Sequence, residues 1–232
     1  MTRESFLAGV RDAAQRGRAF RVPIDERAHQ AGYVGASGGD LVAAMAQSVE
    51  VAGGVAHVAG GWEEAGSTLM KLLDDFRPAS ALCWEHATLE RLGLRGMLEA
   101  RGVRCYSYAS LHQNADDARR EILLAAEIGI SAADLAVAET GSLVLCSGPG
   151  QERTASLLPP VHVAVVARDQ IVPDLLDAFA WLTDQYGPSL PTNVCLVTGP
   201  SKTGDIELEL TTGVHGPGQW HVILVRGDLA EA

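Results

Sequence analysis

The chain has 232 residues, of which 47% are hydrophobic and 20% charged, a composition typical of a globular protein with one core. Its 18 basic and 29 acidic side chains give a formal net charge of -11 without any basic block, which argues against nucleic acid as a partner. No apolar run is long enough to cross a bilayer and the N-terminus has no signal-peptide pattern, so we expect a cytoplasmic protein.

The four cysteines lie far apart in the sequence, and no C-x-x-C pair is present. Three of them fall inside apolar runs typical of strands, which predicts small, reduced core residues. Their separation also predicts that the chain itself binds no iron-sulfur cluster and no structural zinc. They are Cys83, Cys105, Cys146 and Cys195.

The N-terminal segment predicts helices. Residues 3–20 are rich in Ala and Arg with apolar residues near helical spacing, which indicates an amphipathic helix that ends around Gly17. Residues 24–30 are compatible with a second short helix. We therefore expect an N-terminal helical extension over residues 1–31 and one α/β domain over residues 32–232.

Helical and strand patterns then alternate along the chain. Helices are predicted at 40–52, 63–76, 88–100, 117–128, 152–158 and 172–186, and strands at 55–59, 79–84, 103–108, 135–138, 142–146, 161–167, 193–197 and 220–225. Residues 131–134 are predicted to be a connection. Such alternation is typical of βαβ units and predicts an open, mainly parallel sheet flanked by helices.

Glu139 stands at the junction of two short apolar strands, beside Thr140 and Gly141. A carboxylate in such a setting needs a partner or is held neutral, which is a setting in which catalytic glutamates arise. The alternative is a turn with an exposed or salt-bridged Glu139. His162, within a predicted strand, is interpreted as a hydrogen-bonded core residue.

Residues 198–207 and 213–218 form a glycine-rich region between the last two predicted strands. Exposed backbone N–H groups, hydroxyls, one cation and an imidazole occur there together, which favours anion binding. The Lys-Ser/Thr pair of a Walker loop is missing after the second glycine, so no Walker site is predicted. An ordinary Gly/Pro-rich connection remains the alternative. The candidate ligand-binding residues are Gly199, Ser201, Lys202, Thr203 and Asp205, with His215 following.

Four ordered segments over residues 133–225 resemble the family of lactate utilisation protein C (LutC), also called the LUD or DUF162 family. They read ADLAVAETGSLV (133–144), ASLLPPVH (155–162), TGPSKTGDIE (198–207) and GVHGP followed by WHV (213–217 and 220–222). Two departures are Lys202, where Arg is expected more often, and Gly204, where Ala is expected. The first keeps the charge but weakens the case for bidentate anion binding.

The resemblance implies a fold similar to NagB, RpiA and the CoA transferases. It also implies a role in the bacterial oxidation of L-lactate to pyruvate, in which partner proteins carry iron-sulfur clusters and this chain binds none. Under this hypothesis a small carboxylate or phosphate-bearing ligand binds near Lys202, Thr140 and Gly141, with Glu139 and His215 as catalytic candidates.

Two other hypotheses remain open at the level of the sequence. An autonomous small-molecule enzyme, related to CoA transferases, sugar-phosphate isomerases or folate cyclo-ligases, would use Glu139 as nucleophile or base. A scaffold subunit without a site would tolerate substitution of Glu139, Lys202 and His215. Turnover by the purified chain alone distinguishes the first of these from the rest.

Overall fold

The computed structural model describes residues 2–17, 39–204 and 210–227. The chain divides into two compact units, Met1–Val34 and Gly35–Ala232. In the first, helix α1 (Arg3–Gly17) confirms the predicted N-terminal helix, and the residues directly after Gly17 lie outside the described part. The second predicted helix, at residues 24–30, lies outside the described residues, so the proposed boundary after residue 31 stays a prediction.

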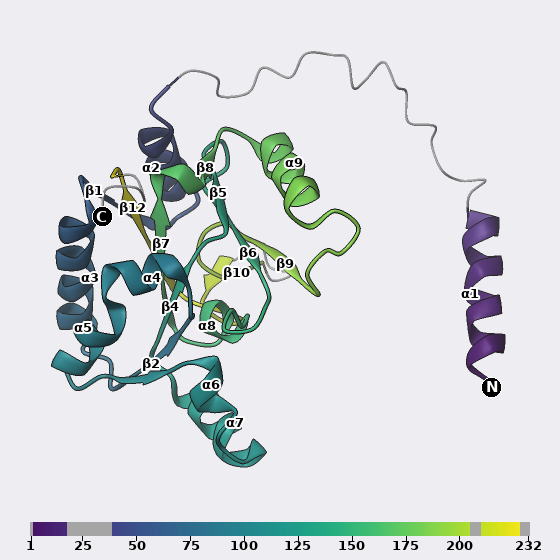
Figure 1. The fold of residues 1–232 in the computed structure, drawn as a ribbon, viewed down its shortest axis with the longest axis horizontal. Coiled ribbons are helices and arrows are strands. Elements are labelled where there is room, and N and C mark those ends of the chain that lie inside the picture. Colours follow the sequence, from purple (N-terminus) through teal and green to yellow (C-terminus); the bar gives the residue numbers. More distant parts are fainter. Residues whose placement is uncertain (1, 18–38, 205–209, 228–232) are drawn as a thin grey trace. The chain divides into compact units, whose positions relative to one another are not determined.

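The second unit is built on a sheet of six strands whose neighbours all pair in parallel (Figure 1). This confirms the predicted open α/β architecture, and none of the described helices is both long and apolar enough to span a bilayer. The strands, in their order across the sheet, are β1 (Val55–Ala59), β12 (Gln219–Val225), β7 (Val161–Ala167), β4 (Ile128–Ala132), β2 (Ser80–Cys83) and β3 (Arg104–Tyr106).

Helices cover both faces of this sheet, as buried parallel strands require. On one face, α2 (Leu41–Val51) and α8 (Thr154–Leu157) pack over the side of the sheet that carries His162 and Trp220. The other face packs against α3 (Trp62–Phe76), α4 (Ala87–Leu92) and α5 (Leu94–Ala100). Two further helices, α6 (Tyr108–Leu111) and α7 (Asp116–Ala125), connect β3 to β4.

A second sheet of four strands, in the order β8 (Ile171–Val172), β5 (Leu135–Val137), β6 (Ser142–Cys146) and β9 (Val194–Val197), is inserted between β4 and β12 in the chain. One of its faces joins the main core, and α9 (Leu175–Tyr186) covers the other with Ala178 and Leu182 (Figure 1). The 3-10 turn Arg168–Gln170 precedes β8. β10 (Lys202–Gly204) and β11 (Leu210–Thr212) form a separate antiparallel pair.

The sequence-based prediction was wrong at the centre of the sheet. Residues 117–128 were assigned to one helix and 131–134 to a connection, but the helix ends at Ala125 and residues 128–132 form strand β4. Apolar residues at 122, 123, 126 and 128 fit helical spacing, and this hid a five-residue strand that is buried throughout.

Three smaller corrections concern helix and strand ends. The helix predicted at 88–100 breaks at Gly93, which has a φ of 74° and closes α4. The helix predicted from residue 172 begins at Leu175, because the Asp174 carboxylate accepts hydrogen bonds from the N–H groups of Leu176 and Asp177. Residues 202–204, predicted to lie in a loop, form a strand.

The strand order places a topological switch between β2 and β4. From β2 the chain moves outward to β3, returns to β4 on the other side of β2, and continues away toward β7. The connections that leave β2 and β4 therefore diverge at the carboxyl edge of the sheet. In open α/β sheets this divergence opens the crevice where ligands bind.

We predict that Gly129→Ala strongly destabilises the domain. A Cβ at Gly129 in β4 would collide with the backbone carbonyl of Ala155 in α8, and a backbone atom cannot move aside. The expected loss in free energy of unfolding is about 3 kcal/mol, measured by urea denaturation. Gly96→Ala is the control, because no atom lies within 4 Å of its added Cβ in α5. It should raise stability by about 0.5–1 kcal/mol, and equal effects of the two changes would contradict this packing.

A second prediction concerns the loss of stability at acidic pH. Complete burial lowers the pKa of His162 to about 4, and its Nε2 lies 2.9 Å from the Ser131 hydroxyl. In the unfolded chain the pKa of His162 is near 6.5, so the unfolded state gains a proton at a pH where the folded state stays neutral. The contribution of neutral His162 to stability is therefore fully present above pH 6.5 and is lost as the pH falls toward 4. The loss is up to about 3 kcal/mol. Between pH 7 and 5, the unfolding free energy should fall more in the wild type than in His162→Gln. Parallel curves would contradict this account.

Candidate functional site

Two motifs found in the sequence meet at the C-terminal end of α2. The turn at Gly141, with a φ of 67°, packs so closely that a Cβ there would lie 2.6 Å from the backbone nitrogen of Val49. Gly199, with a φ of 86°, lies against the Ala52 carbonyl and has no room for a Cβ. Both glycines are therefore required by close backbone approach as well as by their dihedral angles.

A chain of three hydroxyls joins these motifs. The Thr140 and Ser142 hydroxyl oxygens are 2.7 Å apart, and Ser142 is 2.6 Å from the Thr198 hydroxyl. Ser142 is buried, while Thr198 is exposed. The hydroxyls are thus mutually satisfied and fix the start of β6 against the end of β9.

The predicted anion-binding lysine has a protein partner. The Lys202 ammonium donates a 2.7 Å hydrogen bond to the carbonyl of Ala52, the C-cap of α2. A cation at a helix C-terminus interacts favourably with the helix dipole and with its unpaired carbonyls. Lys202 is exposed, and its ammonium has three donors, of which this bond takes one.

Ser201 and His215 lie on two loops that backbone hydrogen bonds join to each other. Ser201 N–H donates to Pro217 O at 2.8 Å, and Gly213 N–H donates to Ser201 O at 2.9 Å, which ties the loop of His215 to the others. His215 itself is exposed. Thr203 lies in β10, whereas Asp205 lies outside the described residues.

Glu139 is exposed in the same region, at the end of β5. Its backbone carbonyl accepts a 3.3 Å hydrogen bond from the Ser48 hydroxyl of α2, and its N–H donates to Pro173 O at 3.0 Å. We call these motif residues the α2 cluster, after the helix whose C-terminal end contacts two of their loops. The cluster consists of Glu139, Thr140, Gly141, Gly199, Ser201, Lys202 and His215. The catalytic and ligand-binding roles of these residues stay predictions.

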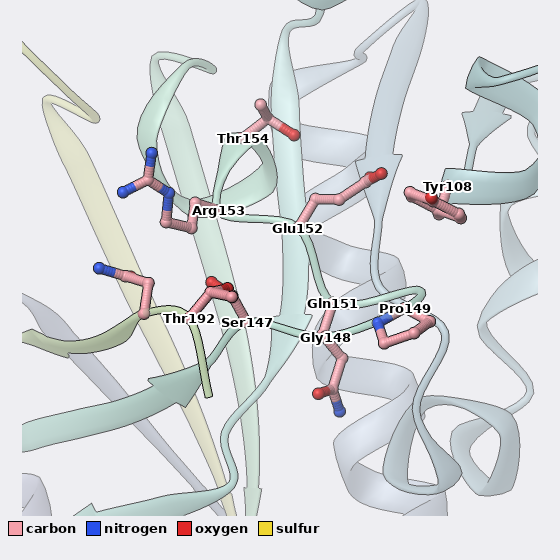
Figure 2. A pocket seen from close by; sticks show the side chains of 10 residues that line it. Tyr108, Ser147, Gly148, Pro149, Gln151, Glu152, Arg153, Thr154 and Thr192 are labelled. Carbon is pink, nitrogen blue, oxygen red and sulfur yellow. The ribbon is translucent and has the colours of Figure 1, made fainter. Parts of the chain in front are cut away.

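A hollow of about 740 Å³ lies between Tyr108, which follows β3, and the loop that follows β6 (Figure 2). The loop after β6 forms its floor and is fixed to the end of β2 by two bonds. Glu85 N–H donates to Gly150 O at 2.8 Å, and the Trp84 indole donates to Glu152 O at 2.9 Å. The lining residues are Tyr108, Ser147, Gly148, Pro149, Gln151, Glu152, Arg153, Thr154, Thr192 and Asn193.

The charged residues of the hollow point in opposite directions. Glu152 extends toward the ring of Tyr108, while Arg153 lies on the far side of the loop (Figure 2). Arg153 is exposed, and among the described residues no carboxylate lies within ion-pair distance of its guanidinium. An unpaired guanidinium beside the hydroxyls of a hollow is suited to a carboxylate or phosphate.

At the Tyr108 end, the geometry fixes a histidine tautomer. His112 Nδ1 lies 2.9 Å from the Tyr108 carbonyl, which can only accept, so Nδ1 carries a proton and Nε2 is the basic nitrogen. The rings of Tyr108 and His112 are tilted by 40° with centroids 3.9 Å apart, and Glu152 Oε1 lies 3.9 Å from Nδ1. Burial raises the pKa of Glu152, and the charge of His112 acts in the opposite direction.

Two titratable groups flank the topological switch itself. Asp134 follows β4 and accepts a 2.7 Å hydrogen bond from Cys146 N–H, while burial raises its pKa. His86 follows β2 and accepts a 3.2 Å bond from Thr88 N–H at Nδ1, while burial lowers its pKa. Their charges act on each other. An acid with a raised pKa and a base with a lowered pKa, near each other, are suited to exchange a proton.

Sequence reasoning missed every one of these groups. Arg153 and Glu152 were assigned only to a short helical piece, and Asp134 to a connection. The available signal was the charged pair one residue after the Gly148-Pro-Gly turn that follows an apolar strand. Tyr108, His112 and His86 carried no signal, since they join the site only through the order of the strands.

The part of the chain that matches a known family lies within the second unit. The family model of the LUD domain matches residues 42–225. Lactate utilization protein C of Geobacillus sp. (strain WCH70) is 32% identical over 162 residues, which cover 66% of this chain and 65% of that protein. Lactate utilization protein C 1 of Bacillus mycoides (strain KBAB4) is 32% identical over 160 residues, 68% of each chain.

A solved structure supports the fold. The crystal structure of a DUF162 family protein from Deinococcus radiodurans aligns with a TM-score of 0.56 and 22% sequence identity, over 80% of this chain and 96% of that one. The family model covers most of the chain, and the Bacillus relative matches two thirds of both sequences. The chain therefore belongs to the LUD domain family of lactate utilization protein C.

Proposed function

We propose that this chain is a component of a bacterial system that oxidises L-lactate to pyruvate, acting with partner proteins that carry iron-sulfur clusters. Its relatives are named for lactate utilization, which supports the pathway. The observation that supports the chain's own part is the hollow at the carboxyl edge of the sheet, with the guanidinium of Arg153 at its side, which pairs with no carboxylate of the described residues.

In this proposal the hollow binds a small organic anion. L-Lactate and pyruvate each carry one carboxylate at neutral pH, and Arg153 can hold it through two parallel hydrogen bonds. The hydroxyls of Thr154, Thr192 and Ser147 line the same hollow and supply neutral donors and acceptors. Because the hollow opens to solvent, a redox group on a partner protein has access to the bound acid.

In this proposal the α2 cluster holds in place the strands that carry the wall of the hollow. Glu139, Thr140, Lys202 and His215 belong to the family motifs, and the described contacts of Lys202 and Thr140 hold loops together. We propose that these residues keep β6 and β9 in position, and so the hollow's wall at Ser147 and Asn193, whose backbones bond at 2.9 Å. Glu139 and His215, both exposed, remain the catalytic candidates of the cluster.

One observation favours autonomous catalysis as the second candidate function. A carboxylate and an imidazole, Asp134 and His86, follow the neighbouring strands β4 and β2 at the switch point, and such side chains can act as acid and base. Turnover of a small acid by the purified chain, without any partner or added acceptor, would establish this alternative.

The growth of a deletion strain on L-lactate as sole carbon source tests the proposal. The intact gene should restore growth, and Arg153→Gln should not, because the carboxylate loses its charged partner. Arg120→Gln is the matched control, since this exposed arginine lies on α7 and does not line the hollow. Immunoblots of soluble protein confirm equal accumulation. Full growth of the deletion strain, without another lactate dehydrogenase, would refute the pathway.

A separate prediction isolates the role of Lys202. If its ammonium serves to cap α2, Lys202→Ala should lower the free energy of unfolding by about 1 kcal/mol, and Lys202→Arg should recover most of it. Both variants should support growth on L-lactate once they accumulate. An unchanged stability of Lys202→Ala, together with lost growth, would instead show that Lys202 binds the ligand.

A further inference from the structure

A small cavity of about 120 Å³ brings two cysteines together at the carboxyl end of β2 and β3. Cys105 pairs with Ala81 in the parallel register, and Cys83 lies two residues further along β2, so both thiols are on the same face of the sheet. Cys83 is buried, whereas Cys105 is only partly buried. The cavity is lined by Cys83, Trp84, Glu85, Leu89, Glu90, Leu94, Arg95, Cys105 and Ser107.

The two thiols are chemically unequal. The interaction between the two sulfurs raises the pKa of the buried Cys83 and lowers the pKa of Cys105, and the guanidinium of Arg95, which lines the same cavity, lowers the latter further. Burial acts in the opposite direction on Cys105, as do the carboxylates of Glu99 and Glu85. Since the thiolate is the reactive form, Cys105 is the nucleophile of the pair and Cys83 its neighbouring thiol.

We propose that Cys105 is a site of oxidation by hydroperoxides and that Cys83 resolves the oxidised product. The Cys105 thiolate attacks one oxygen of hydrogen peroxide, which breaks the O–O bond, gives a sulfenic acid and releases hydroxide. The Cys83 thiol then attacks the sulfenic sulfur. A disulfide forms, and the sulfenic oxygen leaves with a proton as water. Hydrogen peroxide is the two-electron oxidant, and both thiols are oxidised.

The size of the cavity selects the reactant. A water molecule occupies about 30 Å³ in the liquid, so a cavity of 120 Å³ admits hydrogen peroxide. A bulky aromatic disulfide reagent does not fit within this volume. The other two cysteines lie outside this cavity, in β6 and β9. Cys195, also partly buried, is therefore an internal reference for nonspecific oxidation in the same molecule.

The position of the pair links it to the hollow. Trp84 and Glu85 line the small cavity, and these same residues hold the floor of the hollow through their bonds to Glu152 O and Gly150 O. A disulfide between Cys83 and Cys105 would shift the end of β2, which directly precedes Trp84 and Glu85. The state of the thiols is thus coupled through two residues to the geometry of the ligand site.

Timed oxidation of the full chain tests the proposal. The reduced protein is treated with hydrogen peroxide, denatured, alkylated and digested, and the peptides of each cysteine are followed by mass spectrometry. We expect a Cys83 to Cys105 disulfide to form several-fold faster than Cys195 is oxidised. Arg95→Gln should slow this several-fold without changing Cys195. Arg104→Gln, an exposed neighbour of Cys105 on β3, is the matched control and should have no effect.

A second variant tests the resolving role. In Cys83→Ala, oxidation of Cys105 should continue to sulfinic and sulfonic acids, because no thiol is present to form the disulfide. Equal rates at Cys105 and Cys195, equal rates in Arg95→Gln and the wild type, or a Cys105 sulfinic acid beside an unmodified Cys83 in the wild type would each overturn the proposal.

Discussion

The parallel pairing of β2 with β4 is the constraint on which the functional architecture depends. Ile130 lies opposite Cys83 in this pairing, and the Trp84 N–H continues it to Ile130 O at 3.0 Å. Because β3 lies outside β2 and the chain then returns, the connections after β2 and β4 leave in different directions. His86, Asp134, Tyr108 and the loop of Arg153 all come to the carboxyl edge through this reversal.

The end of α2 provides the second fixed point. The carbonyl of its C-cap residue Ala52 accepts a hydrogen bond from the Lys202 ammonium, and its backbone leaves room for glycine alone at 141 and 199. A region whose composition predicts an anion site is therefore also a packing centre, where two loops meet one helix terminus. Backbone N–H groups, small residues and a cation serve both purposes, since close approach and anion binding require the same residue types.

Much of the sheet could be predicted from the sequence. β1 and β7 were predicted residue for residue, because each is an apolar run that begins directly after a glycine or a proline. β4 was missed because its apolar residues also suit a helix, and the break at Gly93 lay within a convincing helical pattern. In both cases tertiary packing decided between two local patterns that the sequence supports equally.

The hollow could not be predicted in the same way. Arg153 and Glu152 follow β6, Tyr108 follows β3, and Thr192 precedes β9, so three separate strand ends or starts are needed before the residues meet. Predicting it requires the strand order, which depends on the strand that was missed. The motif residues were easier to find because they are contiguous, and contiguity is what a single sequence displays.

Calorimetric titration of pyruvate and of L-lactate into the purified chain tests the central claim most directly. The account predicts saturable one-site binding of at least one of the two acids to the wild type. It also predicts affinity reduced by about tenfold or more in Arg153→Gln, since a charge-assisted pair contributes about 1.5–3 kcal/mol. Arg120→Gln should bind as the wild type does. Absence of binding by both acids, or equal binding by Arg153→Gln, would contradict the assignment of the hollow as the ligand site.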